Sequence, residues 1–102
     1  MSFLSYEVRN SVAEIMFNNP PVNALSEQML DEYLSYLAQA AADDAVRAVI
    51  VGSHVPGRFC AGLNLAAVHQ EGVAKFRSLL DRLYINMTDL QFAMGKPTIA
   101  AI

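Results

Sequence analysis

Hydrophobic and polar positions change their period several times along the chain, which predicts strands and helices in turn. The alternating segment 12–17 predicts a strand, and residues 3–8 can pair with it through a turn at 9–11. The β-branched apolar run 46–51 is typical of a strand that is buried on both faces of a sheet. A last apolar run, residues 98–102, predicts another buried strand.

Two segments repeat their apolar residues at helical spacing. The first helix is predicted to begin after Ser26, a good N-cap, and to end near Ala42. The second is predicted over residues 73–92, where Gly95 and Pro97 close it. The predicted apolar stripes are Met29, Leu30, Tyr33, Leu34, Leu37 and Ala41 in the first helix, and Val73, Phe76, Leu80, Leu83, Met87 and Leu90 in the second. This alternation of strands and helices implies right-handed crossovers and parallel pairing, so the predicted fold class is α/β.

Composition narrows the class of protein. The 102 residues make one small domain, 1–102, and the 54% of hydrophobic and 17% of charged residues exclude a disordered polar tail. A net charge of −3 gives no electrostatic reason to bind nucleic acid or an anionic membrane. The single cysteine excludes an internal disulfide, and the sequence has neither a signal peptide nor an apolar run of the roughly 20 residues that cross a bilayer. We therefore expect a cytoplasmic protein with no nucleic-acid or membrane partner.

The apolar run 98–102 stops without a turn, a cap or a polar residue. Natural chain ends are usually polar and exposed. Two interpretations stay open, namely a buried C-terminal strand and a chain cut off within its domain. The apolar-rich composition favours the second.

Titratable side chains do not define a site in this sequence. His54 and His69 have no second His or Cys at ligand spacing beside them, so we predict no metal site. Cys60 follows His54 closely enough to suggest a nucleophile and its base. However, its neighbours Phe59 and Ala61 are apolar, and we interpret Cys60 as a small buried hydrophobe.

The segment 57–65 carries the most informative pattern. It follows the predicted strand 46–51, and ligands of α/β sheets usually bind at the carboxyl ends of the strands. Gly62 permits a tight turn and a close approach of ligand to backbone, and residues 63–68 can begin a short helix whose first amides lack internal acceptors. Such a turn can hold a carbonyl oxygen as it gains negative charge. An ordinary strand-to-helix connection explains the same residues without a site.

Four segments together resemble one known family. They are Asn19-Pro-Pro-Val-Asn-Ala-Leu-Ser26, Val46-Arg-Ala-Val-Ile-Val51, Phe59-Cys-Ala-Gly-Leu-Asn-Leu65 and Lys96-Pro-Thr-Ile-Ala-Ala-Ile102. In order and spacing they resemble the N-terminal half of the crotonase superfamily, the enoyl-CoA hydratases and isomerases, over nearly the whole chain. The first and third segments look closest to the enoyl-CoA isomerase branch. The resemblance implies the N-terminal part of a crotonase-type ββα spiral fold, cut off within the domain.

The resemblance also implies a site and a substrate. In the family, the backbone N–H that follows the motif's glycine is the first donor of an oxyanion hole, and that position is Leu63 here. It would hold the thioester oxygen of an acyl-CoA as an enolate forms. The other substrate-binding positions implied are Ala61, Gly62, Asn64 and Leu65 along the same turn, with Val22 and Ala24 flanking the coenzyme A nucleotide. Coenzyme A enters as part of the substrate, no further cofactor is expected, and the full-length protein is expected to be a homo-oligomer, a trimer or a hexamer.

Departures from the family pattern bear on activity. Pro20 and Pro21 stand where many relatives carry Lys or Arg, and Asn64 stands where Asp is commoner. The family's second oxyanion donor and its catalytic carboxylates follow the segment that matches Ile102. We therefore expect an N-terminal fragment of an enoyl-CoA hydratase or isomerase that is catalytically inactive on its own.

Two alternatives from other classes stay open. One is a non-catalytic crotonase-like protein that binds coenzyme A thioesters or forms oligomers. The other is a generic α/β domain whose likeness to the family is coincidental. Perturbation of the Leu63 amide by an acyl-CoA would argue against the generic domain.

Overall fold

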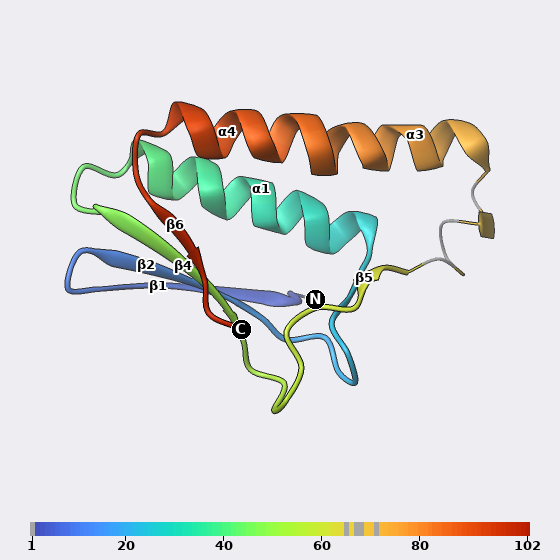
Figure 1. Ribbon diagram of the computed structural model, residues 1–102, viewed down its shortest axis with the longest axis horizontal. Coiled ribbons are helices and arrows are strands. Elements are labelled where there is room, and N and C mark those ends of the chain that lie inside the picture. Colours follow the sequence, from blue (N-terminus) through green and yellow to red (C-terminus); the bar gives the residue numbers. More distant parts are fainter. Residues whose placement is uncertain (1, 65, 67–68, 71) are drawn as a thin grey trace.

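Helices cover one face of a sheet in the computed structural model, which describes residues 2–64, 66, 69–70 and 72–102 (Figure 1). The described strands are β1 Leu4–Arg9, β2 Val12–Phe17, β3 Ala24–Leu25, β4 Ala48–Ser53, β5 Gly62–Leu63 and β6 Thr98–Ala100. The described helices are α1 Glu27–Ala42, α3 Val73–Asp81, the π-helical segment η1 Arg82–Asn86 and α4 Met87–Ala93. This order of strands and helices confirms the predicted α/β class.

The main sheet has the strand order β1-β2-β4-β6. β1 pairs antiparallel with β2, with Leu4 opposite Phe17, whereas β4 lies parallel to β2 and β6 lies parallel to β4. The predicted hairpin and the predicted parallel pairing are therefore both present. Figure 1 shows α1 lying along this sheet, with a long rod formed by α3, η1 and α4 next to α1.

Two strands differ from their predictions. β4 begins at Ala48 rather than at Val46, because the N–H of Val46 donates to a carbonyl oxygen in the turn after α1 (3.0 Å). β6 pairs with β4 alone among the described strands, which leaves Ile99 51% and Ile102 98% exposed. The prediction of a buried last strand is therefore wrong, because an apolar run does not reveal whether a strand lies at the centre or the edge of a sheet.

The first helix begins as predicted and buries most of its predicted stripe, although Leu34 and Ala41 are only half-buried and Ala40 is buried instead. Ser26 caps α1, since its Oγ accepts a hydrogen bond from the N–H of Met29 (3.2 Å). The side chains that α1 buries are Met29, Leu30, Tyr33, Leu37 and Ala40. Apart from Leu30, they form the core together with Ala13, Ile15 and Phe17 of β2 and Val49 and Val51 of β4. The core therefore lies between α1 and the helix-covered face of the sheet.

The second predicted helix, residues 73–92, is a rod in three parts. Within the described residues of α3, η1 and α4, only Leu79 is buried, while Val73 is 86% and Phe92 84% exposed. Most of the predicted apolar stripe nevertheless faces the core, because the partly buried Phe76, Leu83, Met87 and Leu90 pack against buried residues. Val73, at the start of the stripe, is the member that the prediction places wrongly.

Lys96 joins the start of β6 to the end of α1. Its Nζ donates to the carbonyl oxygens of Ala40 (2.7 Å), Ala41 (3.3 Å) and Asp43 (2.8 Å). The last carbonyls of a helix have no partners within the helix, and a cation stabilises them. Because α1 has no basic residue in its own last turn, Lys96 supplies the cap from a distant part of the sequence.

Candidate functional site

Two of the segments that carry the family resemblance, 19–26 and the described part of 59–65, meet in a second, two-stranded sheet. β3 and β5 pair in parallel, with Ala24 opposite Gly62 and Leu25 opposite Leu63. The ladder is continued by the N–H of Ala61, which donates to the carbonyl oxygen of Val22 (3.0 Å). Residues that are far apart in the sequence therefore form one short parallel ladder, and Figure 1 shows its strand β5 near the start of α1.

Leu63 lies in β5 and not at the start of a helix. Gly62 turns the chain with a φ of +92°, and Leu63 then pairs with Leu25. The predicted helix start at Leu63 is therefore wrong, because pairing with β3 extends the backbone at this residue. Of the remaining positions predicted for that helix, Leu65, Ala67 and Val68 lie outside the described residues.

The N–H of Leu63 is directed away from β3. Successive N–H groups of an extended chain point to opposite sides of it. The next N–H, that of Asn64, donates toward β3, to the carbonyl oxygen of Leu25 (2.8 Å). The Leu63 N–H therefore faces the side of β5 that β3 does not occupy, while the half-buried Leu63 side chain packs against the core and anchors this peptide.

Position 62 requires glycine because of the backbone conformation there. A φ of +92° lies in a region that residues with a Cβ rarely adopt. A Cβ built at Gly62 would meet no atom within 4 Å, so space is not what selects glycine here. The predicted tight turn is present.

The other predicted substrate-binding positions lie along the same ladder. Val22, Ala24 and Gly62 are half-buried, whereas Ala61 and Asn64 are exposed. The structure therefore brings together the residues predicted from both segments, with the exception of Leu65, which lies outside the described residues.

Asn23 is a buried polar residue that the sequence reasoning missed. Its side chain is fully buried, and its backbone adopts a φ of 56°. Asparagine tolerates this left-handed conformation better than most residues. Its place between Val22 and Ala24 in the motif was the signal that could have identified it, because short amide side chains often satisfy backbone groups in turns.

Cys60 and His54 do not form a nucleophile–base pair. The Cys60 thiol is half-buried and donates to the carbonyl oxygen of Asn23 (3.4 Å), while its sulfur accepts from the N–H of Gly62 (3.4 Å). The ring Nε2 of His54 lies 3.3 Å from Ser5 Oγ instead. Cys60 therefore links the two motif segments.

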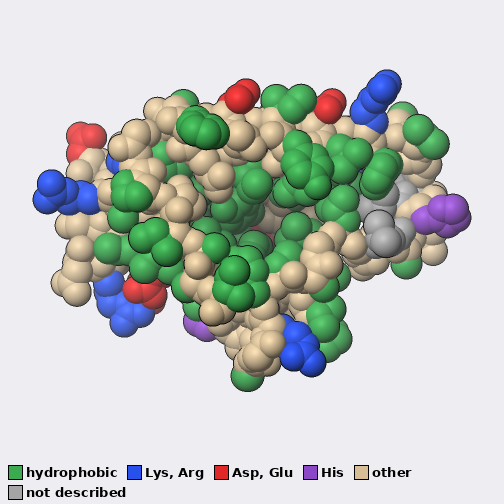
Figure 2. Space-filling model, in the orientation of Figure 1, with side chains coloured by type: hydrophobic (Ala, Val, Ile, Leu, Met, Phe, Trp, Pro, Cys, Tyr) green, Lys and Arg blue, Asp and Glu red, His purple; other side chains and the backbone are tan. Residues whose placement is uncertain are grey.

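An apolar hollow of about 390 Å³ lies beside the ladder. Its walls include Phe17, Tyr33, Phe59, Cys60, Leu83 and Met87. Figure 2 shows a hollow surrounded by hydrophobic side chains in the middle of this face of the molecule. Burial raises the pKa of Tyr33, and a hydrogen bond from Gln91 Nε2 to its Oη (3.1 Å) opposes that rise. The turn that carries Cys60 thus borders both the ladder and the hollow.

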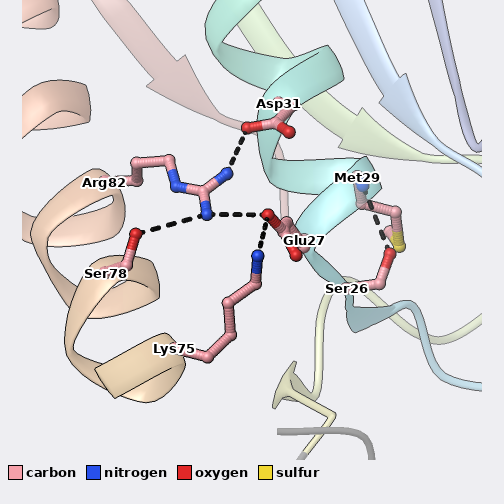
Figure 3. A network of polar contacts seen from close by, with 7 residues as sticks. All are labelled: Ser26, Glu27, Met29, Asp31, Lys75, Ser78 and Arg82. Carbon is pink, nitrogen blue, oxygen red and sulfur yellow. Dashed lines mark hydrogen bonds and ion pairs between the residues drawn. The ribbon is translucent and has the colours of Figure 1, made fainter. Parts of the chain in front are cut away.

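A network of charged side chains joins the rod to the first turn of α1 (Figure 3). Glu27 Oε1 lies 2.7 Å from Lys75 Nζ and 3.0 Å from Arg82 Nη2, and Arg82 Nη1 donates to Asp31 Oδ1 (2.6 Å). The hydrogen bond from Lys75, followed by that from Arg82, holds the pKa of the Glu27 carboxyl below its ordinary value of 4.5. Hydrogen bonds to Glu27 and then Asp31 raise the pKa of Arg82.

Metal and membrane features can be assessed only for the part of the chain that the structure describes. In that part, no group of three or more His, Cys, Asp and Glu side chains could hold a metal ion. No helix there has both the length and the apolar character needed to span a membrane.

The fold and the ladder define an α/β protein whose motif segments meet beyond the carboxyl end of a parallel strand, β4. A sequence profile described as enoyl-CoA hydratase/isomerase matches residues 7–102. The chain is 39% identical over 92 residues to enoyl-CoA hydratase domain-containing protein 2, mitochondrial, of Bos taurus, covering 89% of this chain and 31% of that protein. It is 38% identical over 91 residues to enoyl-CoA delta isomerase 1, mitochondrial, of Rattus norvegicus, covering 82% of this chain and 32% of that protein.

A solved structure agrees with these sequence matches. The crystal structure of an enoyl-CoA hydratase/isomerase from Xanthobacter autotrophicus Py2 superposes with a TM-score of 0.83 at 36% identity, covering 99% of this chain and 38% of that chain. The chain therefore belongs to the enoyl-CoA hydratase/isomerase family of the crotonase superfamily, which confirms the resemblance. It spans about a third of the length of these two curated relatives, 31% and 32%.

Proposed function

We propose that this chain forms one side of an acyl-CoA site, in which the N–H of Leu63 donates to the thioester oxygen. The observation that carries the proposal is the direction of this N–H, away from β3, while the neighbouring Asn64 N–H is used in the ladder. Family membership supports an acyl-CoA thioester as the substrate class. Val22 and Ala24 flank the coenzyme A nucleotide, and Ala61, Gly62, Asn64 and Leu65 line the turn.

The chemistry is hydration or isomerisation of an enoyl-CoA through an enolate. When a proton or a nucleophile is exchanged beside a thioester, negative charge develops on the carbonyl oxygen. A fixed backbone N–H stabilises that charge without reorganising, and one such donor is worth about 10²–10³ in rate. The side-chain packing of Leu63 and the β3–β5 ladder hold this donor in place.

The 102-residue chain is proposed to bind an acyl-CoA but not to turn it over. By the family resemblance, the second donor and the catalytic carboxylates follow the segment that matches Ile102. One donor without a general base stabilises charge but moves no proton. We also propose that the full-length protein is a trimeric or hexameric enzyme of the cytoplasm.

Amide shifts of the ¹⁵N-labelled chain test the proposal directly. We expect acetyl-CoA to shift the Leu63 amide, and S-ethyl-CoA, a thioether that lacks the carbonyl oxygen, to leave this amide largely unshifted. Equal shifts with both ligands, or none with either, would contradict a role for Leu63. An enoyl-CoA should be converted by the chain no faster than by buffer, and faster conversion would refute the predicted inactivity.

A second candidate is a non-catalytic, self-associating protein. The observation that favours it is the open edge of β6, which pairs with β4 alone among the described strands and exposes Ile99. A stable, monodisperse oligomer at micromolar concentration would support it, whereas insoluble aggregates would count against it.

A further inference from the structure

Asn23 lies where three segments of the chain meet. It belongs to the loop before β3, and its side chain reaches both the end of β4 and the turn before β5. Its exposed fraction is 0%, and it is the buried polar residue within the described core. A fully buried amide is costly unless its polar atoms are paired, so its partners indicate what it does.

The carboxamide of Asn23 has a partner in each segment. Its Nδ2 donates to Ser53 Oγ (2.7 Å) and to the carbonyl oxygen of Phe59 (2.7 Å), and its Oδ1 accepts from the N–H of Asn19 (2.7 Å). Both amide hydrogens are therefore used, and both partners lie at a distance typical of strong hydrogen bonds. The side chain thus fixes the turn at Phe59 relative to β4 and to its own loop.

The backbone of Asn23 continues this connection toward Leu63. Its carbonyl oxygen accepts from the Cys60 thiol (3.4 Å), and the same sulfur accepts from the N–H of Gly62 (3.4 Å). The peptide unit that carries the Leu63 N–H begins at the Cα of Gly62. Contacts from Asn23 therefore hold the turn on both sides of Cys60, immediately before the proposed donor.

We propose that Asn23 is a positioning residue for the Leu63 N–H, and that its carboxamide holds the 59–62 turn so that this N–H meets a thioester oxygen. The inference rests on the proposed function and adds a residue that does not itself touch substrate. It requires that loss of the Asn23 donors impair recognition of the carbonyl oxygen specifically. A merely structural role would weaken all ligands alike.

The Asn23→Asp variant removes both donors at nearly constant size. Aspartate also tolerates a positive φ, so the backbone strain stays small. In the wild-type chain, we expect the affinity for acetyl-CoA to exceed that for S-ethyl-CoA by roughly threefold to tenfold, the range that a single hydrogen bond supplies. In the variant, we expect this ratio to fall toward one. The affinity for S-ethyl-CoA alone should be unchanged.

Asn10→Asp is the matched control. Asn10 also has a positive φ, 52°, but it is exposed in the turn between β1 and β2. We expect the wild-type affinity ratio in this variant. Ser53→Ala is a milder second variant, because it removes one acceptor and leaves the bond to Phe59, and it should give an intermediate ratio even if Asn23→Asp fails to fold.

The outcomes test the role of Asn23 separately from the proposed function of Leu63. If a folded Asn23→Asp or Ser53→Ala chain keeps the wild-type ratio, or loses affinity for both ligands equally, the positioning role is overturned and the role of Leu63 stands. If the wild-type chain does not distinguish acetyl-CoA from S-ethyl-CoA, the proposed function fails and the inference fails with it.

Discussion

At the scale of single residues, backbone conformation decides which residue types can occupy two positions at the β3–β5 ladder. Gly62 has a φ of +92° with open space where a Cβ would lie, and Asn23 has a φ of 56° in a fully buried place. Glycine is selected by its freedom alone, whereas asparagine adds buried hydrogen bonds to its tolerance of this region. The cost of replacing Gly62 is therefore conformational rather than steric.

We expect Gly62→Ala to destabilise the chain by about 1–2 kcal/mol, because an L-residue is strained at this φ. The variant should also lose the shift of the Leu63 amide that acetyl-CoA causes. Urea unfolding and amide shifts measure the two effects. Gly95→Ala, at a φ of +67° and likewise in open space, is the control and should lose similar stability but keep the Leu63 response. An unchanged urea midpoint for Gly62→Ala would contradict the argument.

The sequence predicts part of this site and misses the rest for a physical reason. Gly62 and Leu63 stand out because glycine and its neighbours mark a turn after a strand. The partner of Asn23 at Phe59 lies 36 residues further along the chain, and local periodicity carries no information about such a contact. Likewise, pairing of Leu63 with Leu25 could not be inferred from the segment 63–68 alone.

At the scale of elements, ion pairs join the front of the rod to α1 beside a small buried apolar cluster of Leu30 and Leu79. Glu27 in the first turn of α1 meets Lys75 of α3 and Arg82 of η1. These side chains are partly exposed, and the pairs are therefore weakened by salt and depend on the charge of Glu27. The charged part of the contact between the rod and α1 is thus sensitive to acid.

We expect Glu27→Gln to change how stability depends on pH. The pKa of Glu27 in the folded chain is lowered from 4.5, so its contribution to stability is fully present above about pH 4.5. That contribution is lost as the pH falls through the lower folded-state pKa. The stability difference between wild type and variant should therefore shrink on acidification, as measured by urea unfolding from pH 7 downward.

Asp44→Asn is the control for this pH series. It removes an exposed carboxylate at the opposite end of α1. Because this variant keeps the ion pairs of Glu27, it should keep the part of the pH dependence that these pairs cause. A Glu27→Gln difference that grows in acid would show that the ion pairs do not stabilise the fold.

The local helices and strands could be predicted from the sequence, whereas the degree of burial of their side chains could not. The β1–β2 hairpin and α1 follow from alternation, a turn and an N-cap, all of which are encoded over a few residues. The apolar stripe of residues 73–92 contacts the core mostly through partly buried side chains, and Val73 at its start is exposed, because burial depends on what packs against the rod. The same limit explains the exposed Ile99 in a strand predicted to be buried.

At the scale of the whole molecule, the two outer strands of the main sheet differ in character. β1 at one edge alternates polar and apolar residues, whereas β6 at the other edge is apolar throughout apart from Thr98. Unpaired backbone groups beside apolar side chains recruit further strands. The edge of β6 is therefore where this chain is expected to associate.

We expect Ile99→Lys to reduce concentration-dependent association, because a charge on an edge strand opposes strand addition. Val8→Lys places the same charge on β1, the other edge strand, at a residue that is 38% exposed, and should leave association unchanged. Sedimentation velocity over a concentration series measures both. Equal effects of the two substitutions would indicate a response to net charge rather than to the β6 edge.

The cap that Lys96 places on α1 has a consequence for how the chain folds during synthesis. The residues of α1 leave the ribosome long before position 96, and until then Ala41 lacks the Lys96 donor while the carbonyl oxygen of Ala40 has only the N–H of Asp43 (3.4 Å). A nascent α1 therefore has a weakly capped end, which gains its charged cap only when Lys96 and β6 arrive. Docking of the last strand therefore also completes the cap of the first helix, and a ribosome stalled before codon 96 would hold a chain whose α1 has only its local cap from Asp43.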